Sequence, residues 1–166
     1  MKTQLDEFLG SRTLSNDLEQ FLCSLKKPYL KPLYRGMNFP IHVLKIGEIV
    51  EEWHGSSHWS KEFQVALNFA YDGYLNEEYI EELQEDEALL EEYEVEEAMD
   101  LFKEVVFRLS ESTQAIDVDT LVNEWELSRW KHEKEVTFIG TEFEITAIKY
   151  IEDKEKPYYL VDVKEL

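Results

Sequence analysis

Residues 132–145 read HEKEVTFIGTEFEI, a run in which polar and apolar residues alternate as they do in a β-strand. Val136 and Phe138 are two positions apart, so both side chains would point to the same face of the strand. Gly140 interrupts the pattern as a turn would, and apolar residues then resume up to Ile145. The stretch therefore predicts a strand, a turn and the start of a second strand.

Two glutamates lie at the beginning of this predicted strand. Glu133 and Glu135 are separated by one residue. In an extended chain this spacing places both side chains on one face, roughly 6–7 Å apart at the backbone. Two like charges at that distance repel each other unless a positive or polar group uses them. The pair is therefore either an exposed polar edge of an acidic protein or a functional site.

The composition indicates one acidic, globular domain. The chain has 166 residues, 43% of them hydrophobic, which is enough for one domain with a core. The formal net charge of −20 disfavours direct binding of nucleic acid and favours a basic protein partner. A single cysteine, Cys23, excludes an internal disulfide and a cysteine-based zinc site. Because no apolar run could span a membrane and no secretion signal is found, we expect a cytoplasmic monomer.

Helical signals occur in the N-terminal part and in the middle of the chain. Within residues 1–30, two N-terminal helices are predicted over residues 3–9 and 16–26. Residues 73–104 predict an acidic helical insertion. Residues 77–97 within it hold eleven Glu and one Asp, without Lys or Arg. This stretch is either a solvated helix face or a surface that selects a basic partner.

Strands dominate the second half of the chain. The predicted strands are residues 33–35 ending at Gly36, a loosely alternating segment within 41–50, residues 105–109, residues 115–118, and a terminal hairpin of 145–151 with 158–163. Helices thus come first and strands last within a single domain over residues 1–166. This order predicts an α+β fold rather than alternating βαβ units.

Residues 51–60 read EEWHGSSHWS and are expected to form a polar loop, after which Ser60 caps a helix. His54 and His58 have the spacing of two metal ligands on a helix. The glycine and serines between them disfavour a helix, and no third ligand is near in the sequence. No metal site is therefore expected here.

Three segments stand in a characteristic order along the chain. They are Leu33-Tyr34-Arg35-Gly36, then Trp59-Ser60 with the helix that carries Phe69, then Glu133-Lys134-Glu135-Val136. In order and spacing they resemble the mono-ADP-ribosyltransferases of the Arg–Ser–Glu class, and most closely the small bacteriophage enzymes that modify host proteins on arginine. The resemblance runs from Lys31 to the C-terminus. It implies an ADP-ribosyltransferase-like mixed β-sandwich with N-terminal helices and an NAD cleft between its sheets.

The resemblance also implies roles for individual residues. Arg35 would hold a phosphate of NAD, with Tyr34 and Gly36 beside it. Glu135 would be the catalytic glutamate, and Glu133 the upstream glutamate that marks arginine-directed members. The chemistry agrees, because cleavage of the bond between nicotinamide and ribose builds positive charge on the ribose, which a fixed carboxylate stabilises. A second carboxylate could orient an acceptor guanidinium and accept its proton.

The middle segment departs from the family pattern. The Ser-Xaa-Ser element of the family falls on His58-Trp59-Ser60, so Ser60 matches the last serine and His58 replaces the first. Either His58 makes the hydrogen bonds of that serine, or Ser57 replaces it through a local shift, or the activity is weakened or altered. Phe69 matches the packing aromatic behind the nicotinamide pocket of the family.

The expected function is transfer of ADP-ribose from NAD to an arginine of a basic target protein, such as host transcription or translation machinery, with release of nicotinamide. Two alternatives remain open at this point. One is a non-enzymatic acidic binder, or nucleic-acid mimic, that covers a basic protein surface. The other is an NAD glycohydrolase on the same fold.

Overall fold

The computed structural model describes residues 1–50, 55–72, 85 and 100–166. Most of the predicted acidic insertion lies outside the described residues. Its predicted end at residue 104 is wrong, because strand β4 (Phe102–Leu109) already begins at Phe102. None of the helices in the described ranges is long and apolar enough to cross a membrane.

The described residues form both helices and strands, and the strands are mostly antiparallel, as in an α+β fold. The helices are α1 (Lys2–Ser11), α2 (Asn16–Cys23), α3 (Phe63–Asp72) and α7 (Val118–Glu124), with 3-10 helices η1 (Ile41–Val43) and η2 (Ser128–Glu133). The other strands are β1 (Lys27–Tyr29), β2 (Leu33–Pro40), β3 (Ser56–Ser60), β5 (Ser112–Ala115), β6 (Glu135–Ile139), β7 (Phe143–Ile151) and β8 (Tyr158–Glu165). The predicted fold class is therefore confirmed.

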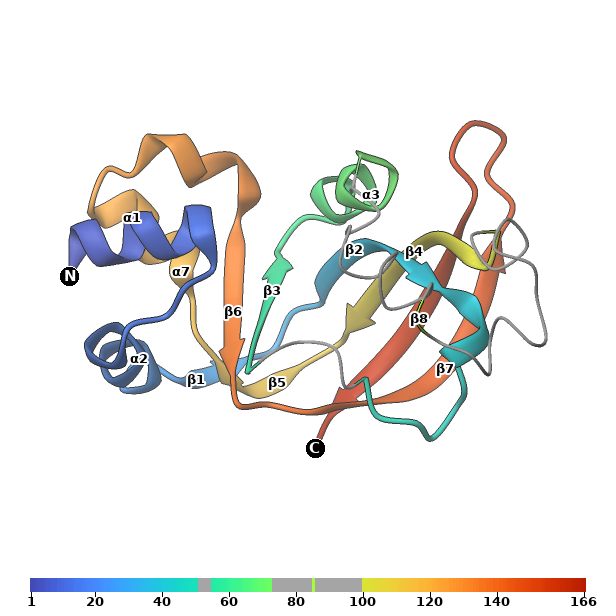
Figure 1. Ribbon diagram of the computed structural model, residues 1–166, viewed down its shortest axis with the longest axis horizontal. Helices are drawn as coiled ribbons and strands as arrows, with labels where there is room; N and C mark the ends of the chain where they lie inside the picture. The colour runs from blue at the N-terminus through green and yellow to red at the C-terminus, as the bar shows by residue number, and fades with distance from the viewer. Residues whose placement is uncertain (51–54, 73–84, 86–99) are drawn as a thin grey trace.

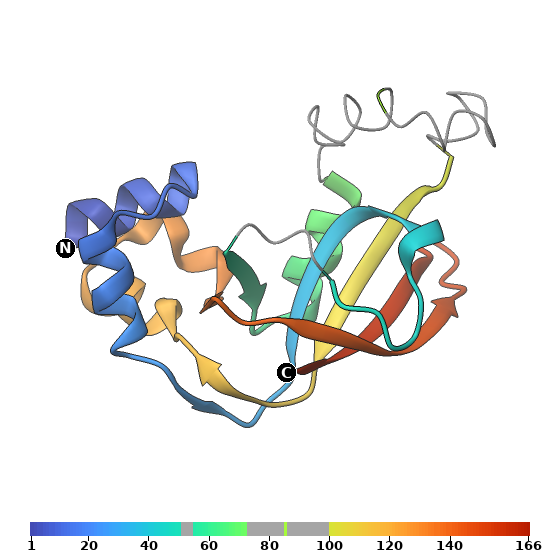
Figure 2. The same cartoon turned by 60° about the horizontal axis from the view of Figure 1, so that its bottom comes forward.

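The larger sheet has the strand order β6-β3-β2-β4-β8-β7, and β1 and β5 pair separately. All neighbours are antiparallel except β4 and β8, which run parallel. Its core contains Trp59, which is 2% exposed and packs against the rings of Phe138 and Phe143. Figures 1 and 2 show β6 and β3 at the end of this sheet that faces the N-terminal helices.

The N-terminal helices form a second core with α7. Buried residues of α1, α2 and α7, among them Phe8, Leu22 and Val122, pack together, and Ile139 joins them from the end of β6. In Figure 1 these three helices gather on one side, next to β6. The C-terminal end of α1 is thereby brought close to the first residues of β6, which are those of the opening sequence stretch.

Helix α3 lies directly on β2 at Gly36. A Cβ atom at this position would be 1.5 Å from the carbonyl oxygen of Ala66 and 2.4 Å from its carbonyl carbon. Only a glycine allows the helix backbone to approach a strand this closely. Ala66 and Ala70 bury their side chains in the resulting contact, together with Val106 of β4. The requirement for Gly36 is thus a packing requirement.

Several predicted boundaries are wrong in ways that packing explains. The first strand does not end at Gly36, because β2 pairs with β4 without interruption from Leu33 to Pro40. Residues 56–60 form β3 rather than a polar loop, because Trp59 is buried in the core and all five positions pair with β6. Residues 41–50 form no continuous strand, although Ile49 makes a single antiparallel bridge to Glu144 of β7. That segment holds η1, and Gly47 has a φ of 91°.

The segment around residue 116 also differs from its prediction. Strand β5 covers Ser112–Ala115 instead of residues 115–118, and Ile116 adds a single bridge to Thr137. Asp117 then caps α7 by accepting a hydrogen bond from the Thr120 amide at 3.2 Å. The two N-terminal helices and the terminal hairpin of β7 with β8 are confirmed, although α2 ends at Cys23.

Candidate active site

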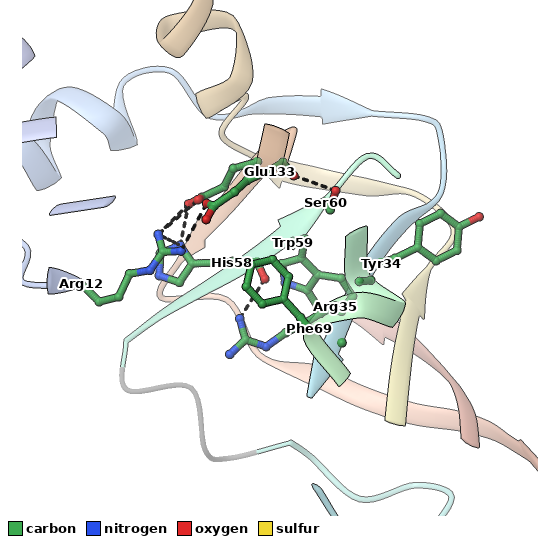
Figure 3. A pocket seen from close by; sticks show the side chains of 11 residues that line it. Arg12, Tyr34, Arg35, His58, Trp59, Ser60, Phe69 and Glu133 are labelled. Atoms are coloured by element: carbon green, nitrogen blue, oxygen red, sulfur yellow. Dashed lines mark hydrogen bonds and ion pairs between the residues drawn. The ribbon is translucent and has the colours of Figure 1, made fainter. Parts of the chain in front are cut away.

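A cavity of about 250 Å³ lies where α1, β2, β3, β6 and α3 meet. All eight residues that the sequence singled out line this cavity, together with Arg12, Trp59 and Ala66. The eight residues are Tyr34, Arg35, Gly36, His58, Ser60, Phe69, Glu133 and Glu135. Figure 3 shows side chains that line the cavity, with Arg12 reaching in from the helical side. Four separate stretches of sequence thus converge on one site.

Glu135 is the most deeply enclosed acid of the site. It is 4% exposed at the start of β6, where it pairs with Ser60 of β3. Its Oε1 accepts hydrogen bonds from Thr137 Oγ1 at 2.7 Å, His58 Nδ1 at 2.7 Å and Arg12 Nη1 at 3.1 Å. Burial alone would raise its pKa, but the hydrogen bond and the charge of His58, the charge of Arg12 and the bond from Thr137 lower the pKa to about 2. Glu135 is therefore ionised at physiological pH.

Glu133 reaches the same cavity from a different element. It is the last residue of η2, and Lys134 between the two glutamates has left-handed angles, φ 50° and ψ 47°. The expectation that both glutamates share one strand face is therefore wrong. Burial and the charge of Glu135 raise the pKa of Glu133 to about 7, against the opposing charge of Arg12. One carboxyl is thus ionised and the other can exchange a proton near neutral pH.

We expect Glu133→Gln to increase the free energy of unfolding at about pH 8 by about 1–2 kcal/mol, and to change it little at about pH 5. The folded pKa of about 7 lies above the ordinary value of 4.5. The wild type therefore loses stability as pH rises through about 7, because folding then has to bury a charge beside Glu135. Glutamine has no such loss. Urea unfolding of both proteins at the two pH values measures the effect. If the variant and the wild type differed equally in free energy of unfolding at both pH values, the raised pKa of Glu133 would be contradicted.

His58 occupies the position of the first serine in the predicted element. Residues alternate across β3, so Ser56, His58 and Ser60 face one side, while Ser57 and Trp59 face the other. Ser57 is 2% exposed and accepts a hydrogen bond from Trp59 Nε1 at 2.9 Å inside the core. The alternative in which Ser57 replaces the serine is therefore wrong.

The His58 ring is held as a hydrogen-bond donor to Glu135. Burial lowers its pKa, although the bond to Glu135 opposes this effect. The shortest contact of Nδ1 is the 2.7 Å contact to Glu135, so we assign the proton to Nδ1 and direct it at the carboxylate. Nδ1 also lies 3.3 Å from Thr137 Oγ1, and the Phe8 ring lies 5.4 Å from the imidazole. His58 therefore orients Glu135.

Ser60 positions the second glutamate. Its Oγ donates to the backbone oxygen of Glu133 at 2.7 Å and accepts from the amide of Glu62 at 3.1 Å. The sequence predicts Ser60 as the cap of helix α3. That prediction is wrong, because α3 begins only at Phe63. The hydroxyl instead ties the end of η2 to the turn before α3, which fixes where Glu133 enters the cavity.

The three predicted residues of β2 line the side of the cavity below α3. Arg35 Nη1 donates to the backbone oxygen of His58 at 2.9 Å, so its guanidinium lies across β3. Tyr34 packs edge-on against Phe63 of α3 at 5.5 Å between ring centroids. Gly36 lies directly against the backbone of α3 at Ala66. A role of Arg35 in holding a phosphate stays a prediction.

Phe69 lies at the edge of the cavity and does not pack behind it. Its side chain belongs to α3 and is 47% exposed, whereas Ala66, one turn earlier, is 1% exposed. The role of Phe69 behind a nicotinamide pocket stays a prediction. An exposed aromatic ring at the mouth of a cavity is suited to cover a flat ligand ring.

Two residues of the site were missed by reasoning from the sequence. Thr137 is fully buried and donates to Glu135, and its position two residues after Glu135 on one strand would have indicated a shared face. Arg12 gave no such signal. It belongs to the helical part of the chain and reaches the glutamates only because α1 packs beside β6. Among the residues with described positions, no group of three or more His, Cys, Asp or Glu could hold a metal ion.

Comparisons with known proteins identify the fold. No protein-family model matches the sequence, and no curated protein has a significantly similar sequence. The Vis toxin, an ADP-ribosyltransferase from Vibrio splendidus, superimposes with a TM-score of 0.54 at 14% identity, over 99% of this chain and 72% of its own. Vis in complex with agmatine gives 0.51 at 15% identity, over 99% and 73%. Plx2a, an ADP-ribosyltransferase toxin from Paenibacillus larvae, gives 0.46 at 13% identity, over 97% and 78%. The superposition on Vis shows that the chain has the α+β fold of this ADP-ribosyltransferase.

Proposed function

We propose that this protein transfers ADP-ribose from NAD to the guanidinium group of an arginine side chain, with release of nicotinamide. The observation that carries the proposal is the pair of carboxyls in one cavity, an ionised Glu135 and a Glu133 with a pKa of about 7. The fold it shares with Vis supports the same reaction. That Vis was crystallised with agmatine, a guanidinium compound, favours arginine as the acceptor.

The residues of the cavity fit NAD as a substrate. NAD supplies an activated bond between nicotinamide and ribose. Glu135, held by hydrogen bonds from His58 and Thr137, provides negative charge where positive charge develops on that ribose as the bond breaks. The aromatic rings of Tyr34 and Phe69 offer flat apolar surface, and Arg35 offers a cation for a phosphate.

Glu133 is assigned to the acceptor. A guanidinium is protonated at all ordinary pH values, so it must lose a proton when it forms a bond to the ribose. Proton transfer is most efficient to a base whose pKa lies near the working pH, and Glu133 meets this condition. A basic target protein fits the net charge of −20. Host transcription or translation machinery stays the proposed target.

We expect Glu133→Gln to lower ADP-ribose transfer to agmatine by about 10²-fold or more, while hydrolysis of NAD falls by less than about tenfold. The variant keeps Glu135 and loses the group that accepts the proton. Transfer by the wild type should rise with pH through about pH 7, where Glu133 becomes ionised, and the residual transfer of the variant should lack this rise. Chromatography of nicotinamide, free ADP-ribose and the agmatine adduct separates the two reactions.

The same assay distinguishes the two alternatives. An NAD glycohydrolase would release nicotinamide and free ADP-ribose at the same rate with or without agmatine, and Glu133→Gln would leave it unaffected. A non-enzymatic acidic binder would release no nicotinamide under any condition. Transfer to agmatine by the wild type, lost in the variant, is the outcome that supports the proposal.

A further inference from the structure

Arg12 is the charged residue of the cavity to which the proposed mechanism gives no role. Its Nη1 lies 3.1 and 3.2 Å from the two carboxylate oxygens of Glu135, and its Nη2 lies 3.8 Å from Oε2 of Glu133. Figure 3 shows this guanidinium entering the cavity towards the acidic side chains. It thus occupies the place in which the proposed function puts the guanidinium of a target.

The chain contains four arginines, and Arg12 differs from the other three. Arg35 donates to a backbone oxygen of β3. Arg108 is held by both carboxylate oxygens of an aspartate on β8, at 2.6 and 2.9 Å. Arg129 lies over a tryptophan ring, 4.3 Å from its centroid. Within the described ranges, the ion pairs of Glu133 and Glu135 with arginine are both made by Arg12.

The side chain of Arg12 can change its ion-pair partner from Glu135 to Glu133 without disturbing the packing of a hydrophobic core. It lies at the C-terminal cap of α1 with φ 59° and ψ 18°, and residues 12–15 belong to no helix or strand. Its side chain is 38% exposed, whereas that of Glu135 is 5% exposed. Rotation of the side chain towards Glu133 would free Glu135 to face the ribose of NAD. Nη2, the nitrogen already nearer Glu133, would then lie beside the carboxylate that accepts a proton.

We infer that Arg12 is an internal acceptor, so that the protein attaches ADP-ribose to its own Arg12. The inference rests on the proposed function. A nitrogen of the guanidinium forms the new bond to the anomeric carbon of the ribose. The bond from that carbon to nicotinamide breaks, and nicotinamide leaves with the electron pair. The proton lost by the guanidinium passes to Glu133. The product places a dinucleotide-sized group at the mouth of the cavity, so labelling should stop at one group per chain.

Incubation of the purified chain with NAD alone tests the inference. We expect a mass increase of one ADP-ribose, which peptide mass spectrometry assigns to Arg12. Its first-order rate constant should stay the same over about a tenfold range of protein concentration, because the reaction is intramolecular. Arg12→Lys should lose the label, whereas the matched change Arg129→Lys, at an exposed arginine on η2, should keep it. An excess of agmatine should reduce the label at least severalfold by competing for the acceptor position.

Parallel measurement of nicotinamide release in the presence of agmatine separates this inference from the proposed function. Transfer to agmatine without a label on Arg12 would overturn the inference and leave the proposed function standing. If Arg12→Lys also accelerated transfer to agmatine, Arg12 would block the acceptor position instead of being modified there. A label on another arginine, or a rate constant that rises with protein concentration, would overturn it as well. Absence of nicotinamide release under every condition would overturn the function and the inference together. Mapping of the wild-type adduct decides the case even if Arg12→Lys is inactive.

Discussion

Glu135→Gln should lower nicotinamide release from NAD by about 10³-fold or more, both with and without an acceptor. Glutamine has nearly the same size but carries no charge, so the positive charge that develops on the ribose loses its buried counter-charge. The surroundings of Glu135 make the loss large. Three donors hold one oxygen of this carboxylate, and burial excludes water from it. Nicotinamide release under saturating NAD is the measurement.

The comparison with Glu133→Gln makes this prediction specific. Loss of Glu135 should abolish hydrolysis and transfer alike, whereas loss of Glu133 should affect transfer far more. Glu124→Gln, at an exposed position on α7, controls for the removal of one negative charge from the chain. Urea unfolding of each variant shows whether the fold is kept. A folded Glu135→Gln protein that hydrolyses NAD at a rate close to that of the wild type would contradict the assigned role.

Gly36→Ala should reduce the free energy of unfolding by about 3 kcal/mol or more, or prevent folding altogether. The added Cβ would lie 1.5 Å from the carbonyl oxygen of Ala66, which belongs to a helix backbone and cannot turn aside. Helix α3 would have to move away from β2. That movement would open the contact of Ala66 and Ala70 with Val106 and displace Phe69 at the edge of the cavity. Urea unfolding measures the stability.

Gly10→Ala is the matched control, because it makes the same chemical change where there is room. The nearest atom to a Cβ at Gly10 is the end of the flexible Arg129 side chain at 3.1 Å, and alanine is the better helix former within α1. We expect its stability to stay within about 1 kcal/mol of the wild type. If both alanine variants were equally stable, the close approach of α3 to β2 would not be required for folding.

Local patterns were sufficient to predict the elements that depend on neighbours in the sequence. Alternation of apolar residues predicted the hairpin of β7 and β8, and helical spacing predicted α2. The polar composition of residues 51–60 led to the wrong prediction of a loop, because residues 56–60 form strand β3. Trp59 and Ser57 face the core there, while His58 and Ser60 face the cavity. Local composition cannot show which face of a segment another sheet element will cover.

The sequence alone, through its resemblance to a known family, predicted eight residues that the tertiary structure places around one cavity. Their chemical types and order carried that information. Only the tertiary structure decided that the two glutamates differ in pKa and that the guanidinium of Arg12 contacts both of them. Glu133 ends a 3-10 helix and Glu135 begins a strand, with different burial, so their carboxyls have pKa values of about 7 and about 2. Arg12 joins them across more than a hundred positions of sequence, because packing of α1 beside β6 is a long-range contact that no local pattern encodes.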